Sequence, residues 1–218
     1  MSALAFAFST QARARESQEF AEASQLANAG QATGYYRLGR LYELGREVEQ
    51  DLYEAARQYQ LAAELGHAES QFALGLVLTG ALPDSPRSAR KSFNWFNKAA
   101  QQGHPMAAYF LAMSYETGVG TVPDGEQAFA WYRRAAMNGS SQAMNAVAHM
   151  YATGAGIRLN LANAHAWNQV AGARGFEGAA RYAAKLEARM SEEDLALARK
   201  LVRGLMKKYG GAPPAGPL

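Results

Sequence analysis

The sequence lacks cysteine and long apolar runs, and it is poor in valine and isoleucine. The absence of cysteine excludes disulfides, thiolate metal sites, cysteine nucleophiles and iron–sulfur clusters. Apolar runs such as residues 3–8 are far shorter than the roughly 20 residues that a membrane-spanning helix needs. Seven valines and one isoleucine are too few for a sizeable sheet, whereas alanine, leucine, glutamine, glutamate and arginine are plentiful. We therefore expect an all-α fold without a membrane span.

Glycine, in contrast, is abundant and regularly spaced. The chain has 21 glycines among 218 residues, which is unusual for a helical protein unless glycine has fixed roles. Intervals of 36, 37, 36 and 36 residues separate Gly30, Gly66, Gly103, Gly139 and Gly175. A period of this length predicts an array of helical repeats. The predicted full repeats are residues 31–66, 67–103, 104–139 and 140–175.

Large side chains recur in step with these glycines. Eight residues before a glycine stand Gln58, Trp95, Trp131 and Trp167, and the next positions hold Tyr59, Phe96, Tyr132 and Asn168. Because the tryptophans occupy matching positions, we expect all three to pack in the core. Truncation of any of them to alanine would then cost about 3–5 kcal/mol.

The first half of each period has the pattern of an amphipathic helix. Leu38, Leu41 and Tyr42 stand at i, i+3 and i+4, which places them on one helix face. Gly39 lies beside that face, where the lack of a side chain would let a neighbouring helix approach closely.

The second half predicts another helix, joined to the first by a polar loop. The loops 118–124 and 154–160 end in Asp124 and Asn160, which are typical N-cap residues. The second helix of the third repeat is expected to end at Gly139 in the left-handed conformation. Each period is therefore interpreted as one helical hairpin.

Two segments of these hairpins resemble a known family. Residues 38–45 and 131–139 are similar to the two signature segments of the Sel-1-like repeat family, which is related to the tetratricopeptide repeats. The resemblance covers about residues 18–181 and implies a right-handed α-solenoid of about 11 helices. The loop 80–88 departs from the pattern by one extra residue and two prolines. In the fourth repeat, Asn168 replaces the aromatic residue and Gly172 replaces an alanine.

The solenoid is expected to span residues 16–190, with half repeats at both ends. Residues 191–209 are predicted to form a polar capping helix that begins at Ser191, because an array of hairpins leaves an apolar face open at its end. Residues 210–218 are predicted to be a disordered tail. Residues 1–15 are either a flexible segment or the remnant of an export signal, which leaves a cytoplasmic and a periplasmic or exported location both open.

No motif points clearly to catalysis. The pair Ser88 and Lys91 fits the S-x-x-K pattern of serine β-lactamases, but the accompanying S-D-N and K-T-G patterns are missing. Without H-E-x-x-H or ligand-spaced carboxylates, His149 and His165 are interpreted as solvated or core residues. His67 and His104 follow capping glycines and are expected to satisfy the last carbonyls of the preceding helices. We predict neither a metal nor a cofactor, and a hydrolase of the β-lactamase type is the least favoured interpretation.

Positive charge is concentrated at the C-terminal end. From residue 178 onward, eight basic residues oppose four acidic ones, which gives this segment +4 against a total of +3. A solvated capping helix is the simplest interpretation, and an acidic partner or an anionic membrane surface is the alternative. Nucleic acid is not expected, because aromatic residues are not interleaved with the arginines.

Function is expected to come from the curved surface of the array. By resemblance to tetratricopeptide arrays, the first helix of each hairpin would line the concave groove. The candidate partner-binding residues on these helices are Arg37, Arg40, Leu76, Phe110, Met113, His149 and Tyr182. A groove with an apolar centre and a basic end suits a peptide with apolar anchors and an acidic flank. The simpler interpretation is that Phe110 and Met113 pack against neighbouring second helices.

The leading hypothesis is a monomeric, non-enzymatic adaptor or scaffold that binds another protein or peptide in signalling, envelope assembly or regulation, as the family resemblance implies. The alternative is an immunity or inhibitor protein that blocks a secreted bacterial enzyme. The inhibitor hypothesis predicts one partner that is bound very tightly, whereas the adaptor hypothesis predicts several partners that are bound weakly.

Overall fold

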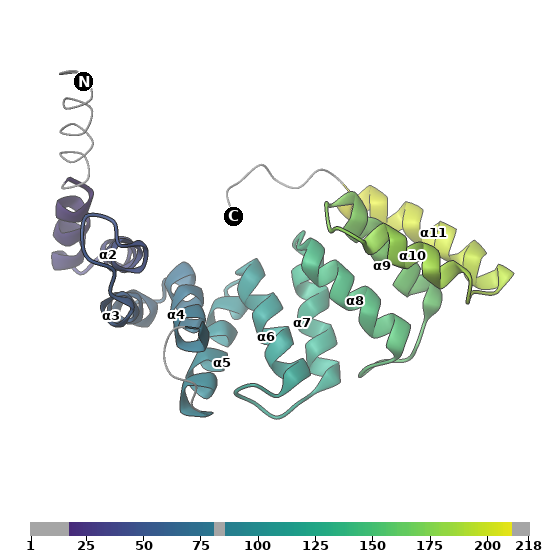
Figure 1. The fold of residues 1–218 in the computed structure, drawn as a ribbon, viewed down its shortest axis with the longest axis horizontal. Helices are drawn as coiled ribbons and strands as arrows, with labels where there is room; N and C mark the ends of the chain where they lie inside the picture. Colours follow the sequence, from purple (N-terminus) through teal and green to yellow (C-terminus); the bar gives the residue numbers. More distant parts are fainter. Residues whose placement is uncertain (1–17, 81–85, 211–218) are drawn as a thin grey trace, which may run out of the picture. The chain divides into compact units, whose positions relative to one another are not determined.

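The described part of the protein is entirely helical. A computed structural model describes residues 18–80 and 86–210, in which eleven helices and no strands are found (Figure 1). The predicted N-terminal segment 1–15, most of the loop 80–88 and the tail 211–218 therefore lie outside the described residues. The chain divides into two compact units, one of which ends at His104 while the other begins at Pro105.

Both units are built from consecutive helical hairpins, as the glycine period predicts. The first unit contains a helix over residues 18–28, α2 (Ala32–Leu44), α3 (Leu52–Glu64), α4 (Ala68–Gly80) and α5 (Pro86–Gln101). The second contains α6 (Pro105–Thr117), α7 (Gly125–Met137), α8 (Ser141–Thr153), α9 (Leu161–Ala173), α10 (Ala179–Glu187) and α11 (Glu192–Tyr209). The hairpins are α2 with α3, α4 with α5, α6 with α7, and α8 with α9. Within the units, α3 also packs against α4, and α7 against α8.

The predicted caps define where the second helices begin and end. Asp124 accepts a hydrogen bond from the backbone N–H of Gln127 at 3.0 Å, and Asn160 accepts one from Asn163 at 2.9 Å. Gly139, which follows α7, has φ 95°, and its N–H donates to the carbonyl of Ala136 at 3.0 Å. These contacts satisfy backbone groups that a helix terminus otherwise leaves without partners.

Glycine allows the two helices of the first hairpins to approach closely. A Cβ atom added to Gly39 of α2 would lie 2.6 Å from the Tyr59 ring of α3. A Cβ atom added to Gly75 of α4 would lie 2.5 Å from the Phe96 ring of α5. Both distances are shorter than nonbonded carbon atoms tolerate, which confirms the role predicted for Gly39.

The aromatic residue after each tryptophan, and not the tryptophan itself, holds the buried position. Tyr59, Phe96 and Tyr132 are buried, whereas Trp95 and Trp131 are only half-buried. Trp95 packs against the core around Tyr59, as predicted, but full burial is wrong for both Trp95 and Trp131. Trp167 is the exception, because its ring stacks at 5.9 Å on Tyr209 of α11 and only 6% of the residue is exposed. Two adjacent residues on a helix point in directions about 100° apart, so only one of them can face the core fully. Because both positions hold large residues in the repeats, the sequence alone does not show which of the two is buried.

A ring pair joins the helices of three hairpins, and an amide pair replaces it in the fourth. The ring centroids lie 6.0 Å apart for Tyr36 and Tyr59, 5.9 Å for Phe72 and Phe96, and 5.4 Å for Tyr109 and Tyr132. At the matching positions of the fourth hairpin, Asn145 donates a hydrogen bond to Asn168 at 2.9 Å. The departure of Asn168 from the repeat pattern is therefore matched by a change in its partner.

The last helix packs on α9. Ser191 begins α11 with a capping box, in which its hydroxyl accepts from the Asp194 N–H at 3.1 Å and the Asp194 carboxylate accepts from the Ser191 N–H at 3.3 Å. Both α10 and α11 pack against α9. Ala198 is the buried residue of α11, and Tyr209 stacks on Trp167. That α11 acts as a solubilising cap remains a prediction.

Candidate binding site

The first unit contains a cavity between α3 and α5, to which α4 also contributes. Its volume is about 660 Å³, within the usual range of ligand-binding pockets. It is lined by Tyr53, Ala56, Arg57 and Gln60 of α3, Leu74 and Leu78 of α4, and Lys91, Asn94, Trp95, Asn97 and Lys98 of α5. We call the space that these residues line the α3–α5 cavity.

Helical spacing brings these side chains to the cavity. The α3 residues Tyr53, Ala56, Arg57 and Gln60 stand at i, i+3, i+4 and i+7, and four of the α5 residues, Lys91, Asn94, Trp95 and Lys98, have the same spacing. That spacing places each set on one face of its helix. Leu78 of α4 supplies partly exposed aliphatic surface, and Leu74, one turn earlier, is buried beneath it.

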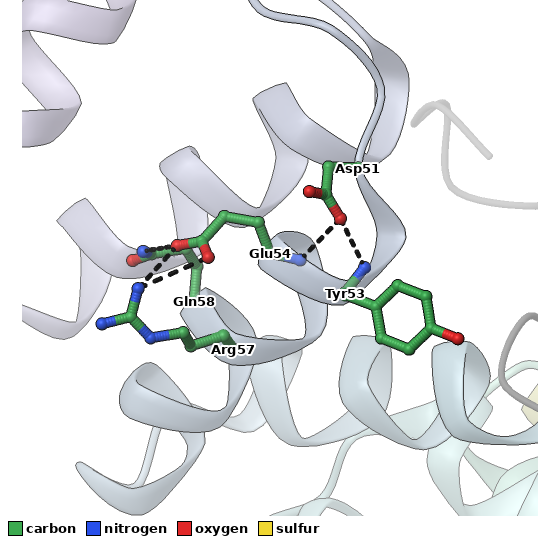
Figure 2. A network of polar contacts seen from close by, with 5 residues as sticks. All are labelled: Asp51, Tyr53, Glu54, Arg57 and Gln58. Atoms are coloured by element: carbon green, nitrogen blue, oxygen red, sulfur yellow. Dashed lines mark hydrogen bonds and ion pairs between the residues drawn. The ribbon is translucent and has the colours of Figure 1, made fainter.

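A small polar network fixes the α3 side of the cavity (Figure 2). The Asp51 carboxylate caps α3 by accepting from the N–H groups of Tyr53 at 2.9 Å and Glu54 at 3.0 Å. The Glu54 carboxylate in turn lies 3.1 Å from Arg57 Nη1 and accepts from the Gln58 side chain at 2.6 Å. The Tyr53 ring points away from these side chains and is 69% exposed.

Two lysines and a tryptophan form the α5 side. Lys98 Nζ lies 4.0 Å from the centroid of the Trp95 ring, which is a cation–π arrangement. Lys91 and Lys98 are exposed, whereas Trp95 is half-buried and packs against the core around Tyr59 and Leu74. The Trp95 ring therefore connects the core of the unit to the cavity.

The cavity combines positive charge, amides and apolar surface. Among the described residues that line it, three are cationic and none is acidic. Three amide side chains, Gln60, Asn94 and Asn97, can both donate and accept hydrogen bonds. Ala56 and Leu78 supply partly exposed aliphatic surface. A ligand that fits these groups carries carboxylates or another anionic group next to an apolar one.

The residues predicted to bind a partner lie elsewhere and are divided between the two units. In the first unit, Arg37 and Arg40 are exposed on α2, and Leu76 is half-buried on α4. A hydrogen bond with Tyr36 raises the pKa of Arg40 above its ordinary value, so Arg40 carries its charge under all ordinary conditions. None of these three residues lines the α3–α5 cavity.

In the second unit, the predicted residues differ in exposure. His149 is exposed on α8, whereas Phe110 and Met113 are half-buried on α6. Tyr182 of α10 packs against a cluster formed by Ala152, Ala164 and Leu186, so part of its ring belongs to the core. That these residues and those of the first unit contact a common partner remains a prediction.

The histidines that follow the capping glycines satisfy the last carbonyls of the preceding helices, as expected. They do so through their backbone N–H groups, and that of His104 donates to Ala99 at 3.1 Å. The His67 N–H, and not its ring, donates to the last turn of α3, at 3.1 Å from the Ala62 carbonyl. The ring lies at the start of α4, where Nδ1 accepts from the Ser70 N–H at 3.3 Å. The side chain therefore caps the following helix, since the backbone N–H already satisfies the preceding one.

His104 and His165 are each placed near a carboxylate. Burial lowers the pKa of His104 below its ordinary value, and Glu69, 4.0 Å from Nε2, offsets part of this effect. His165 is buried on α9, as a core histidine would be, and its Nε2 lies 2.8 Å from Glu187 Oε1. This carboxylate could not be predicted from ligand spacing in the sequence, because it is 22 residues away on α10.

The α3–α5 cavity itself was not predicted from the sequence. Trp95 was interpreted as a core residue, and Lys91 was considered only with Ser88 as part of a catalytic pattern. The structure places Lys91 on the cavity and leaves Ser88 half-buried. The sequence does contain a pattern that could have indicated the α5 side of the cavity. Helical spacing places Lys91, Asn94, Trp95 and Lys98 on one face of α5.

In residues 18–80 and 86–210, no helix combines the length and apolarity needed to cross a bilayer. The same residues contain no group of three or more histidine, aspartate or glutamate side chains arranged to hold a metal ion.

Curated relatives match parts of the chain. Chitin synthase regulator SKT5 of Malassezia restricta is 35% identical over 103 residues, which are 46% of this chain and 7% of the relative. Chitin synthase regulatory factor 1 of Schizosaccharomyces pombe is 39% identical over 71 residues, which are 32% of this chain and 16% of the relative. The chain thus spans only a small part of the length of these relatives.

Solved structures match most of the chain. The protein c5321, described as a protective antigen of uropathogenic Escherichia coli with an SLR fold, is 28% identical with a TM-score of 0.79. The match covers 88% of this chain and 41% of that one. A Sel1 repeat protein from Oxalobacter formigenes is 25% identical with a TM-score of 0.73, and the match covers 94% of this chain and 88% of that one. Four consecutive matches to the Sel1 repeat, at residues 32–67, 68–104, 105–140 and 141–176, agree with the hairpins, and the chain belongs to the Sel1 repeat family.

Proposed function

We propose that this protein is a non-enzymatic adaptor that binds another protein. Membership of the Sel1 repeat family supports this function, and so do the two fungal relatives, whose names describe them as regulators of chitin synthase. The observation that carries the proposal is the α3–α5 cavity. It gathers cationic, amide and aromatic side chains from two helices around one hollow.

The predicted first-helix residues offer a second surface for the same function. Arg37 and Arg40 stand one turn apart on α2 and are exposed, so an acidic segment of a partner can reach both. This surface and the α3–α5 cavity lie on different helices of the first unit, and paired variants can therefore distinguish them.

Affinity purification with cross-linking and mass spectrometry tests the adaptor function. The full chain is used as bait beside two double variants, Arg57→Glu/Lys98→Glu in the cavity and Arg37→Glu/Arg40→Glu on α2. Both variants exchange two exposed cations for anions, so they change the net charge equally. Each captured protein is then purified and titrated against the three baits.

The adaptor proposal predicts a partner that forms a defined complex with the wild type and is released by at least one of the two variants. Selective loss with the cavity variant assigns binding to the α3–α5 cavity, and selective loss with the α2 variant assigns it to the first helices. A purified exported enzyme that is inhibited on binding would identify an inhibitor instead. If no captured protein binds the purified wild type, the adaptor function is wrong.

A further inference from the structure

We infer that the α3–α5 cavity binds an acidic peptide segment of the partner, in which an apolar side chain is flanked by carboxylates. This inference rests on the proposed adaptor function and specifies its ligand. It follows from three properties of the cavity: its apolar surface, its charge and its amides.

The apolar surface accepts one side chain of the segment. Leu78 of α4 and Ala56 of α3 are partly exposed at the cavity above the buried Leu74, and the half-buried Trp95 ring adds an aromatic surface. A volume of about 660 Å³ is large enough for a side chain with its neighbouring backbone. Burial of an aliphatic or aromatic side chain there would supply the non-directional part of the affinity.

The charge selects for carboxylates beside that side chain. Arg57 stands on one side of the cavity, and Lys91 and Lys98 stand on the other, so an anionic segment would meet cations on both sides. The Arg57 side chain is 70% exposed, and its ion pair with Glu54 is a surface pair of small energy. A carboxylate of the partner can therefore share the guanidinium with Glu54.

The amides favour a peptide over other anions. Gln60 donates one N–H to Glu64 at 2.8 Å, and the Asn97 carbonyl oxygen accepts from Gln101 at 3.2 Å. The other donors and acceptors of these two amides, together with Asn94, can match the N–H and C=O groups of an extended backbone. A nucleic-acid strand would need cations spaced along a track to follow its phosphates. An anionic membrane presents a surface of headgroups and not a single segment that can enter a cavity.

Fluorescence polarisation tests the inference on the full chain. The probe is a blocked, fluorescein-labelled peptide with one central leucine flanked by glutamates on both sides, and the comparison peptide has glutamine in place of every glutamate. The glutamate peptide is expected to bind at least about tenfold more tightly, because its carboxylates can pair with cations on both sides of the cavity. Added salt should weaken its binding.

Matched variants locate the binding. Arg57→Glu/Lys98→Glu should weaken binding of the glutamate peptide at least about tenfold, whereas Arg199→Glu/Lys200→Glu, the same charge change on exposed α11 residues, should leave it within about twofold. The milder Arg57→Gln/Lys98→Gln should give an intermediate loss, and thermal melts check that each variant folds. Peptide binding should also change the tryptophan emission of the wild type and not that of Trp95→Phe.

Several results would overturn the inference. They are equal binding of the two peptides, equal loss with the cavity and α11 variants, and tighter binding of phosphatidylserine vesicles or a single-stranded oligonucleotide than of the glutamate peptide. A captured partner that binds the cavity variant as tightly as the wild type would also overturn it, while the adaptor function itself would stand. The adaptor function fails separately, when no purified partner binds the wild type.

Discussion

At the scale of single residues, the hairpins depend on a contact between a small residue on the first helix and a large one on the second. Gly39 meets the Tyr59 ring and Gly75 meets the Phe96 ring, with no space for a methyl group. The matching residues of the third and fourth hairpins are Ala112 and Ala148. A methyl group is thus accommodated in the second unit and excluded in the first two hairpins.

Gly39→Ala is expected to lower the free energy of unfolding by about 1–2 kcal/mol, because overpacking against the Tyr59 ring outweighs the roughly 1 kcal/mol gained in helix propensity. Gly204→Ala is the control. Gly204 lies within α11, and an added Cβ atom would have no other atom within 4 Å, so alanine there should raise the free energy of unfolding by about 0.5–1 kcal/mol. Urea unfolding measures both, and a stabilising effect of Gly39→Ala would contradict the packing described for this contact.

Two buried tyrosines also bind carboxylates of the preceding helix. The Tyr59 hydroxyl donates to Glu43 at 2.5 Å, and the Tyr132 hydroxyl donates to Glu116 at 2.7 Å. Burial first, and then these hydrogen bonds, raise the pKa of both tyrosines well above the ordinary value near 10. Both hydroxyls therefore stay protonated in the folded protein at pH values where unfolded tyrosine ionises.

This difference predicts instability at alkaline pH. Above pH 10 the unfolded chain binds fewer protons at these tyrosines than the folded chain, so the free energy of unfolding falls as pH rises. Between pH 10 and pH 11 the wild type should lose about 2 kcal/mol more than the variant Tyr59→Phe/Tyr132→Phe. Urea unfolding at several pH values measures the two slopes, and parallel slopes would show that the tyrosines ionise equally in both states.

At the scale of helices, the sequence predicted the hairpins because each boundary has a local chemical cause. Asp124 and Asn160 cap helices by accepting backbone N–H groups, and Gly139 ends α7 with a positive φ that other residues rarely adopt. These capping residues lie within a few positions of the helix ends that they determine, so the sequence alone indicates where the helices begin and end. The distinction between Trp95 and Phe96 was missed because it depends on contacts with other helices.

Removal of α11 tests its contact with α9. A chain that ends at Met190 should expose Trp167, whose ring stacks on Tyr209, and the apolar surface that Ala198 covers. The expected result is a red shift of tryptophan emission and a lower free energy of unfolding, since a buried aromatic contact is lost. In the background of Trp167→Phe the truncation should produce no such shift. An unchanged spectrum of the truncated wild type would contradict the packing of α11 on α9.

At the scale of the whole molecule, the repeats could be predicted and the α3–α5 cavity could not. The repeat follows from a period that the sequence carries in many columns, such as Gly66 and Gly103. The cavity forms where one face of α3 lies opposite one face of α5. That Arg57 and Lys98 line the same cavity depends on how these two helices pack, which the sequence pattern does not show. For the same reason, the predicted first-helix surface was assembled from residues that the structure divides between two units.

Hydrogen exchange with mass spectrometry on the complex of the full chain with its partner tests the central claim most directly. Binding in the α3–α5 cavity predicts slower exchange in peptides that cover residues 53–60 and 91–98, because a bound segment restrains the helices that it contacts. Slower exchange confined to the first helices, around Arg37, Phe110 and His149, with α3 and α5 unchanged, would contradict the assignment of this cavity as the binding site.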